Sequence, residues 1–501
     1  MWDIVVVGSG YGGSVAAARL ASGRRLLLLE RGKRWQSGEF PQSLPQIASS
    51  LRSARNPLGY WSLRLGPGTG NAIVSALGGA SLANYGITAR PDASIFRDWP
   101  WAPHALDEGF ARAESVLAAS PNPLVDSLAD RAFLEAMEPG RSVALRNAID
   151  WSRCRQCGHC VPGCNYAAKR SLDRSYLPLA EQAGAFIRDR SEVRHFEPRP
   201  GGGYRLWVVR SDRPQEGEWI EAARVILAAG TFGSLELLRR SSAFFTWSPA
   251  LGQGMSMNGD ALALIYATRH RLDAEHGAPI SSAVRLQVEV GGGETRALTI
   301  MSGRIPHSIH HASARLLVGL APLWGRLPGQ GAPPSSSRPL PSLSMLADLR
   351  GAAKGGALSR SFLYKLDAQD AARGKAGFDA SGEAHIAWPD YGDDPVLQAA
   401  WQRMDRWASA SGGRIVPGLS LWFGHHLGVH PLGGCRMGES FETSVVNRYG
   451  EVWHPEGGVY EGLQILDGSI VPGALGVPPS LTITALTESI LAASQSKPRS
   501  A

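Results

Sequence analysis

The first thirty residues alternate short apolar runs with a glycine-rich turn. Residues 4–7 are Ile-Val-Val-Val, residues 8–13 contain four glycines, and residues 14–21 have a helical composition. A second apolar run at residues 26–29 ends at the acidic Glu30. Short apolar runs bounded by turns are typical of buried strands, and the longer segment between them is typical of a helix. This pattern predicts a strand, a tight turn, a helix and a second strand that ends at a carboxylate.

The glycines of this turn have the G-x-G-x-x-G spacing of a dinucleotide site. Gly8 permits the tight turn, Gly10 lets the backbone approach a pyrophosphate, and Gly13 lets helix and strand pack closely. Glu30 falls twenty residues after Gly10, where a carboxylate can accept hydrogen bonds from a ribose hydroxyl. The pattern predicts a dinucleotide cofactor and leaves NAD and FAD open.

Further apolar runs that break into glycine turns recur along the chain. A glycine-rich loop occupies residues 76–86, and an apolar run at residues 225–229 breaks at Gly230. Near the C-terminus stand His-Pro-Leu-Gly-Gly-Cys from residue 430 and Leu-Asp-Gly-Ser-Ile-Val-Pro from residue 466. With these motifs in this order, the chain resembles the glucose-methanol-choline (GMC) family of FAD-dependent oxidoreductases, most closely its cholesterol-oxidase-like branch. The matching blocks are residues 3–34, 76–91, 154–185, 222–260 and 424–490.

The resemblance implies an α/β fold, with a Rossmann-like FAD/NAD(P)-binding domain of the GMC type and an inserted α+β substrate domain on an antiparallel sheet. Residues 1–100, 186–260 and 420–501 would form the discontinuous FAD-binding domain. Residues 101–185 would be a connecting segment that carries a four-cysteine loop at 154–164. Residues 261–419 would form the substrate-binding cap.

The resemblance also implies which residues contact FAD. The loop that contains Gly79 would lie over the flavin, Val193 would meet the adenine through its backbone, and Asp467 and Gly468 would meet the pyrophosphate and the ring. The expected cofactor-binding residues are Gly8, Gly10, Tyr11, Gly12, Gly13, Glu30, Arg31, Gly78, Gly79, Ser81, Asn84, Tyr85, Gly86, Val193, Ala229, Gly230, Asp467, Gly468 and Pro478.

His430 matches the family's catalytic base, which removes the hydroxyl proton while the alcohol carbon loses a hydride. An imidazole, with an ordinary pKa of about 6.5, can accept that proton at neutral pH. Relatives usually carry asparagine or histidine where this chain has Pro478, and proline offers no donor for a second contact to the substrate oxygen. Asn258, His425 and His426 are candidates for that contact.

The composition fits a soluble globular protein, with 44% hydrophobic and 19% charged residues. The net charge of +7 is spread along the chain and forms no basic block, so we expect no nucleic-acid partner. Neither a signal-peptide core nor an apolar run long enough to span a bilayer is found, which predicts a cytoplasmic enzyme.

Four of the five cysteines, Cys154, Cys157, Cys160 and Cys164, form a C-x2-C-x2-C-x3-C run. Thiolates at this spacing can converge on one iron-sulfur cube. Zinc would more typically use two separate C-x2-C pairs, and four reduced cysteines kept for packing are the plain alternative. We therefore expect FAD and a possible 4Fe-4S cluster. A cluster would pass electrons to an acceptor protein or a quinone, which favours a dehydrogenase over an oxidase.

The aromatic and aliphatic residues of the predicted cap favour an apolar or bulky alcohol, such as a sterol, a terpenoid or a long-chain alcohol. Residues 360–365 and 383–389 are predicted to be strands of the cap sheet. Apolar residues among arginines at 312–326 are compatible with contact to a membrane surface or with an ordinary cap helix.

Three alternatives to an alcohol dehydrogenase stay open. One is an oxidase of the same fold that uses oxygen and has no cluster. Another is a non-redox flavoprotein, a lyase or decarboxylase, which Pro478 motivates. The last is an electron-transfer protein that binds no small substrate.

Overall fold

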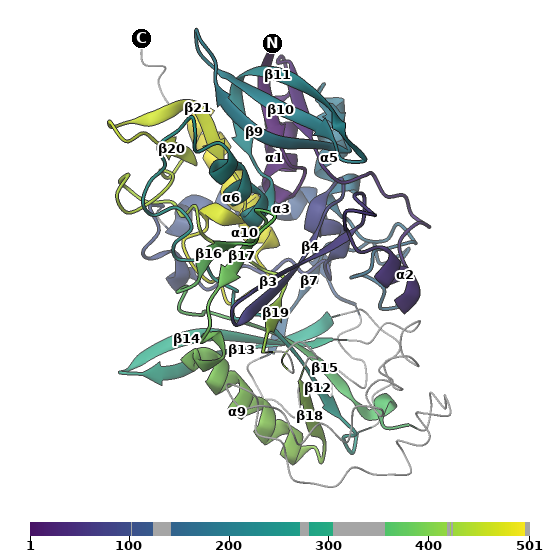
Figure 1. Cartoon of the computed structure of the whole chain (residues 1–501). Coiled ribbons are helices and arrows are strands. Elements are labelled where there is room, and N and C mark those ends of the chain that lie inside the picture. The colour runs from purple at the N-terminus through teal and green to yellow at the C-terminus, as the bar shows by residue number, and fades with distance from the viewer. Residues whose placement is uncertain are drawn as a thin grey trace.

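The computed structural model describes residues 1–101, 103–123, 142–270, 280–303, 356–417, 421 and 424–495 (Figure 1). Two large sheets organise this part of the chain, an eight-stranded mixed sheet and a six-stranded antiparallel sheet. Residues 312–326, expected either to contact a membrane or to pack as a cap helix, lie outside the described residues.

The eight-stranded sheet is built from three separate parts of the chain. Its strands are β1 (Trp2–Val7), β2 (Leu26–Leu29), β8 (Phe186–Arg188), β9 (Ser191–Pro198), β10 (Tyr204–Arg210), β11 (Arg213–Leu227), β20 (Glu451–Trp453) and β21 (Val459–Ile465). The order is β20-β21-β11-β1-β2-β8, and β10 and β9 extend from β11. The five strands from β21 to β8 run parallel. All four leucines of β2 are buried, as expected for a parallel strand covered on both faces.

Helices from distant parts of the sequence lie beside this sheet (Figure 1). They are α1 (Tyr11–Leu20), α3 (Asp107–Val116), α5 (Tyr176–Gln182), α6 (Gly230–Arg240) and α10 (Ser480–Gln495). Helix α1 contacts α5 and α10, α10 also contacts α3, and α6 packs on β9. The first strand, turn, helix and second strand predicted from the sequence are all present.

The six-stranded sheet is antiparallel throughout. Its order is β18 (Arg414–Pro417), β12 (Ala261–Tyr266), β15 (Phe362–Ala368), β14 (Glu294–Gly303), β13 (Ile280–Gly291) and β6 (Ser142–Ala144). Helix α9 (Pro395–Ala410) contacts four of these strands and buries Leu397, Trp401 and Met404. The Asp394 side chain caps α9 by accepting a hydrogen bond from the Val396 amide.

Two small sheets connect the large ones. In the first, β3 (Trp61–Gly66) pairs with β4 (Thr69–Val74), and β19 (His426–Gly428) runs parallel to β4. The second is a hairpin of β16 (Lys375–Phe378) and β17 (Ala384–Ala387). The expectation that residues 383–389 join the cap sheet is wrong, because β17 packs on β3, β4 and α6 instead. Residues 360–365, in contrast, do lie largely in β15 of the six-stranded sheet.

The remaining elements are short. They are α2 (Leu44–Ser49), β5 (Ser120–Pro121), β7 (Arg146–Asn147), η1 (Gly79–Ala83), η2 (Ala93–Phe96), η3 (Pro103–Leu106), η4 (Leu172–Arg174), η7 (Leu358–Arg360), η8 (Tyr391–Asp393) and η10 (Gly468–Ile470). Among the helices of the described ranges, none combines the length and the apolar character needed to cross a bilayer.

Candidate active site

A cavity of about 330 Å³ lies where the first strands, the loop before α6 and the C-terminal motifs meet. Its volume is within the range of small-molecule sites, about 300–1,000 Å³. It brings together most of the residues expected at the cofactor. Those that line it are Gly8, Gly10, Tyr11, Glu30, Arg31, Gly79, Asn84, Tyr85, Val193, Ala229, Gly230, Asp467, Gly468 and Pro478.

Two of the expected cofactor glycines serve packing and do not line the cavity. A Cβ atom at Gly12 would lie 1.5 Å from the Leu466 carbonyl oxygen, and one at Gly13 would lie 1.9 Å from the Gly8 carbonyl oxygen. Their lack of a side chain lets α1 approach the neighbouring backbone. We therefore assign Gly12 and Gly13 an indirect part in cofactor binding.

Gly78, Ser81 and Gly86 also lie behind the cavity wall. The Ser81 hydroxyl donates to the Gly78 carbonyl at 2.7 Å and accepts from the Leu172 amide at 3.0 Å. Gly78 has φ +103° and Gly86 has φ +67°, which are left-handed conformations that glycine adopts easily. These residues shape the loop whose other members line the cavity.

Gly10 leaves open space for a cofactor, and no neighbouring protein atom requires a glycine at this position. It is the N-cap residue of α1, and a Cβ atom placed there would meet no protein atom within 4 Å. The space beside it belongs to the cavity. A pyrophosphate would sit well here, because the amides at a helix N-terminus attract anions. The backbone amides at the N-terminus of α1 and the open space beside Gly10 therefore fit the pyrophosphate of a dinucleotide.

Glu30 lines the same cavity and is held by the first glycine turn. Its Oε2 accepts hydrogen bonds from the Ser9 amide at 3.1 Å and the Ser9 hydroxyl at 2.6 Å, and its Oε1 accepts from the Gly32 amide. Carboxylate oxygens carry further lone pairs, so a ribose hydroxyl can still be bound. Ser9, which sequence reasoning did not single out, also accepts from the Gly78 amide at 2.9 Å and so joins the two glycine loops.

Asp467 fixes the backbone turn that presents Gly468 to the cavity. Its carboxylate accepts from the Ser234 hydroxyl at 2.5 Å and from the Ser469 amide at 2.9 Å. Burial raises the pKa of Asp467, although these hydrogen bonds oppose that shift. On the glycine-rich loop at residues 76–86, the Asn84 side-chain Nδ2 donates to the Tyr11 hydroxyl at 2.5 Å.

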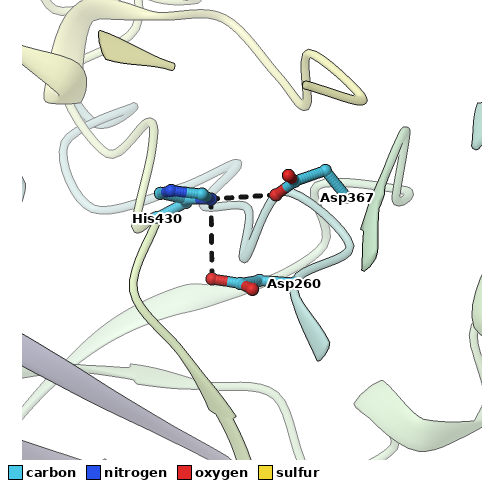
Figure 2. A group of neighbouring side chains, drawn as sticks. All are labelled: Asp260, Asp367 and His430. Carbon is cyan, nitrogen blue, oxygen red and sulfur yellow. Dashed lines mark hydrogen bonds and ion pairs between the residues drawn. The ribbon is translucent and has the colours of Figure 1, made fainter. Parts of the chain in front are cut away.

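His430 lines the cavity two residues after β19. Its Nδ1 lies 2.9 Å from Asp367 Oδ1 and 3.5 Å from Asp260 Oδ2. Figure 2 shows the second ring nitrogen pointing away from both carboxylates. When Nδ1 carries the ring proton, it donates a hydrogen bond to Asp367. Nε2 is then unprotonated and can act as an acceptor. In this arrangement a buried carboxylate orients the imidazole, so that Nε2 is available to accept a proton.

Lys365 completes this group of charges, and sequence reasoning missed it. Its Nζ lies 2.5 Å from Asp260 Oδ1 and 2.8 Å from Asp367 Oδ1. Burial alone lowers the pKa of Lys365, but the two carboxylates outweigh burial and raise it. Burial likewise raises the pKa of Asp367, but Lys365 and His430 outweigh burial and lower it. The available signal was two charges, Lys365 and Asp367, on one face of an otherwise apolar strand.

The ligand atoms of Asp260, Asp367 and His430 lie within 4.8 Å of one another, as metal ligands can. The Lys365 ammonium contacts both carboxylates and supplies the positive charge that a metal ion would bring. We therefore interpret the group as an ion-pair network around the His430 imidazole.

The three residues expected to assist His430, namely Asn258, His425 and His426, do not line the cavity. Asn258 is fully buried: its Nδ2 donates to Asp367 and to the Val477 carbonyl, and its Oδ1 accepts from the Leu475 and Gly476 amides. With every polar atom of its side chain bonded, Asn258 has none left for a substrate oxygen. It supports Asp367 and the turn before Pro478 instead.

His426 is buried against Tyr391, with ring centroids 5.3 Å apart. Burial lowers the pKa of His426 to about 4, so this ring is neutral at physiological pH. The neighbouring His425 places Nδ1 3.1 Å from the Gly66 carbonyl oxygen and does not line the cavity either. The suggestion that one of these histidines replaces the residue missing at Pro478 is not supported by their positions.

All four clustered cysteines are free and partly exposed. Within the described chain, no three of their sulfurs lie within 4.8 Å of one another. A zinc ion with Zn–S bonds of about 2.3 Å would bring its sulfurs to roughly 3.8 Å, so this spacing does not fit zinc.

The four-cysteine loop borders the cofactor cavity. Val161, between the third and fourth cysteines, is one of the lining residues. Lys169 is buried, and its Nζ donates to the carbonyls of Leu82 at 2.6 Å, Asn84 at 3.0 Å and Cys160 at 2.7 Å. Burial lowers the pKa of Lys169 to about 8. Sequence reasoning missed this residue, which ties the cysteine loop to the loop over the cavity.

Comparison with known proteins agrees with this geometry. The GMC oxidoreductase family models match residues 3–257 and 424–487. The chain is 27% identical to a cholesterol oxidase of Mycobacterium tuberculosis (strain ATCC 25618 / H37Rv), over 97% of this chain and 90% of the relative. It is 24% identical to a cholesterol oxidase of Acinetobacter baumannii, over 97% and 93%. A long-chain-alcohol oxidase of Arabidopsis thaliana is 23% identical, over 96% of this chain and 65% of the relative.

Among solved structures, pyridoxine 4-oxidase from Mesorbium loti superposes with a TM-score of 0.62 at 18% identity, covering 100% of both chains. This likeness confirms the expected α/β fold with a Rossmann-like domain. The two family models together cover more than half of the chain, at the segments that form the cavity. The chain belongs to the GMC oxidoreductase family and is an FAD-dependent oxidoreductase.

Proposed function

We propose that this protein oxidises the hydroxyl group of an apolar or bulky alcohol, with His430 as the base. The observation that carries the proposal is the 2.9 Å contact between His430 Nδ1 and Asp367 Oδ1 on a histidine that lines the cavity. In this geometry Nε2 receives the hydroxyl proton while the carbinol carbon loses a hydride and becomes a carbonyl carbon. Bound FAD supplies the hydride acceptor.

The residues around the cavity support both parts of this assignment. Gly8, Gly10 and Glu30 would hold the dinucleotide, for the reasons given by their geometry. Asp367 keeps the proton on Nδ1 and stabilises the imidazolium that forms on Nε2 protonation. The cavity beside His430 also favours an enzyme over an electron-transfer protein without a substrate.

The substrate class follows from the lining near His430. Besides the charged Asp260 and Lys365, the antiparallel sheet and the segments beside His430 contribute apolar side chains to the cavity, namely Leu262, Ile280, Leu427, Val429 and Pro479. Burying an apolar substrate against such residues is favourable, whereas a sugar would lose hydrogen bonds to water. Relatives named for cholesterol and for long-chain alcohols support the same class.

Anaerobic mixing of the FAD-loaded protein with a panel of alcohols tests this function. We expect cholesterol, a terpenoid alcohol or a long-chain primary alcohol to bleach the flavin absorbance, and glucose to bleach it least. Reduction by glucose alone would contradict the substrate class. Conversion of a substrate without any bleaching would instead support a lyase or decarboxylase.

We also infer that the four-cysteine loop holds a 4Fe-4S cluster that carries electrons from the flavin to a protein or quinone acceptor. What supports this is the spacing of the cysteines and the position of their loop beside the cofactor cavity. The oxidase alternative needs no such loop.

Iron and acid-labile sulfide assays with EPR spectra of anaerobically purified protein test the cluster. Cys160→Ala should lose the cluster signal, whereas Cys435→Ala, a buried cysteine outside the loop, should keep it. Iron-free protein from such a preparation, with hydrogen peroxide formed during turnover in air, would favour the oxidase.

A further inference from the structure

Three buried charges surround the Nδ1 side of His430. Asp260 and Lys365 meet across paired strands, since Lys365 is opposite Leu262 in β12 and Asp260 directly precedes β12. Asp367 follows Lys365 by two residues and therefore lies on the same face of β15. The relative exposures of Asp260, Lys365 and Asp367 are 2%, 5% and 0%, so water screens their interactions weakly.

The balance of charge in this group depends on Lys365. Two carboxylates and one ammonium carry a net charge of −1 around a neutral imidazole, and protonation of His430 brings the sum to zero. Without the ammonium the same states would carry −2 and −1. Extra negative charge favours the imidazolium, which cannot accept a proton from a substrate.

Lys365 lines the cavity, but all of its N–H donors are used within the protein. Its three N–H groups are taken by Asp260 at 2.5 Å, Asp367 at 2.8 Å and the Leu366 carbonyl at 3.1 Å. An ammonium has no further donor. It is therefore a candidate positioning residue and not a direct contact that replaces the one missing at Pro478.

Among the described residues, the other titratable groups that interact with these carboxylates do not supply a positive charge. Burial raises the pKa of Tyr85, which also interacts with Asp260, and that of Tyr391, which interacts with both carboxylates. His426, in edge-to-face contact with Tyr391, is neutral at physiological pH. Asp370 accepts hydrogen bonds from the Met257 and Gly259 amides, and burial raises its pKa to about 6. The remaining carboxylate, Asp394, caps α9 and interacts with Arg296 at 3.7 Å.

We propose that Lys365 keeps His430 in the neutral form that a base requires, by neutralising one of the two carboxylates that hold the imidazole. The proposal rests on the proposed function in that it explains how His430 can serve as the base. It assigns a positioning role to a residue that lies about a hundred positions from its partner Asp260 in the sequence.

NMR titration of the FAD-loaded protein with labelled histidine tests this directly, with the His430 signal assigned from its loss in His430→Gln. In Lys365→Gln, His430 should lose its proton at a pH about 1–3 units higher than in the wild type. Lys365→Arg keeps the charge and should titrate near the wild type. The double variant Lys365→Gln/Asp260→Asn restores the net charge and should shift back toward the wild type.

A His430 titration that is unchanged in Lys365→Gln would overturn the proposal, as would an equal shift in Lys365→Arg. If Lys365→Gln does not fold, the Asp260→Asn variant tests the proposal instead. It should move the His430 titration to lower pH, because it removes one negative charge. An unchanged titration or a shift to higher pH would contradict the proposal. The titration needs no substrate. Failure of the proposed function would instead appear as wild-type protein that no alcohol reduces, whatever the titration shows.

Discussion

Replacement of His430 by glutamine should lower the rate constant of flavin reduction by an alcohol by about 10²–10⁴-fold, the usual contribution of a general base. Glutamine keeps a donor toward Asp367 and a similar size, but it has no group that accepts a proton at neutral pH. Anaerobic stopped-flow spectroscopy under saturating alcohol measures this rate directly, without the later transfer of electrons to an acceptor.

The matched control is His195→Gln. His195 lies in β9, stacks on Phe244 and contacts Trp219 edge-to-face. It is not among the residues that line the cavity. In His195→Gln, the alcohol should reduce the flavin at the wild-type rate. Retained flavin content and an unchanged melting temperature in both variants would show that the fold is intact. A His430→Gln protein that is reduced as fast as the wild type would mean that another group removes the proton.

The parts of the site that sequence could predict are those encoded in short contiguous segments. The turn at residues 8–13 and Glu30 are related by one strand, one helix and a second strand, so their spacing along the chain sets their positions in space. His430 could be singled out as a candidate site residue because its neighbours form a family motif, and the structure places it at the cavity. Such local patterns can be recognised in the sequence without knowledge of the rest of the fold.

Contacts that depend on strand register could not be predicted in the same way. Lys365 reaches Asp260 because β12 and β15 pair with Leu262 opposite Lys365, and a shift of one residue would turn Lys365 to the other face. Asn258 was misjudged for a related reason. Its φ of +59° and its four hydrogen bonds show that it is a turn residue, which is a property of the folded backbone and not of the local sequence.

Replacement of Gly10 by valine should leave the protein folded but weaken its binding of FAD. The new side chain would enter the cavity, since a Cβ atom at this position meets no protein atom within 4 Å. Overpacking against a ligand costs up to about 3 kcal/mol, which corresponds to a dissociation constant that is about 100-fold higher. The purified variant should therefore lack the flavin absorbance, and isothermal titration with FAD should show the weakened binding.

Gly473→Val is the matched control for this experiment. Gly473 is also partly exposed and outside the left-handed region, and a Cβ atom there also meets nothing within 4 Å, but Gly473 does not line the cavity. The two variants thus share any general effect of replacing glycine on the unfolded chain, and they differ in what the new side chain faces. Normal FAD content in Gly473→Val and its loss in Gly10→Val would locate the pyrophosphate at the N-terminus of α1. Normal FAD content in both would contradict this position, because a branched side chain and a pyrophosphate cannot occupy the same space.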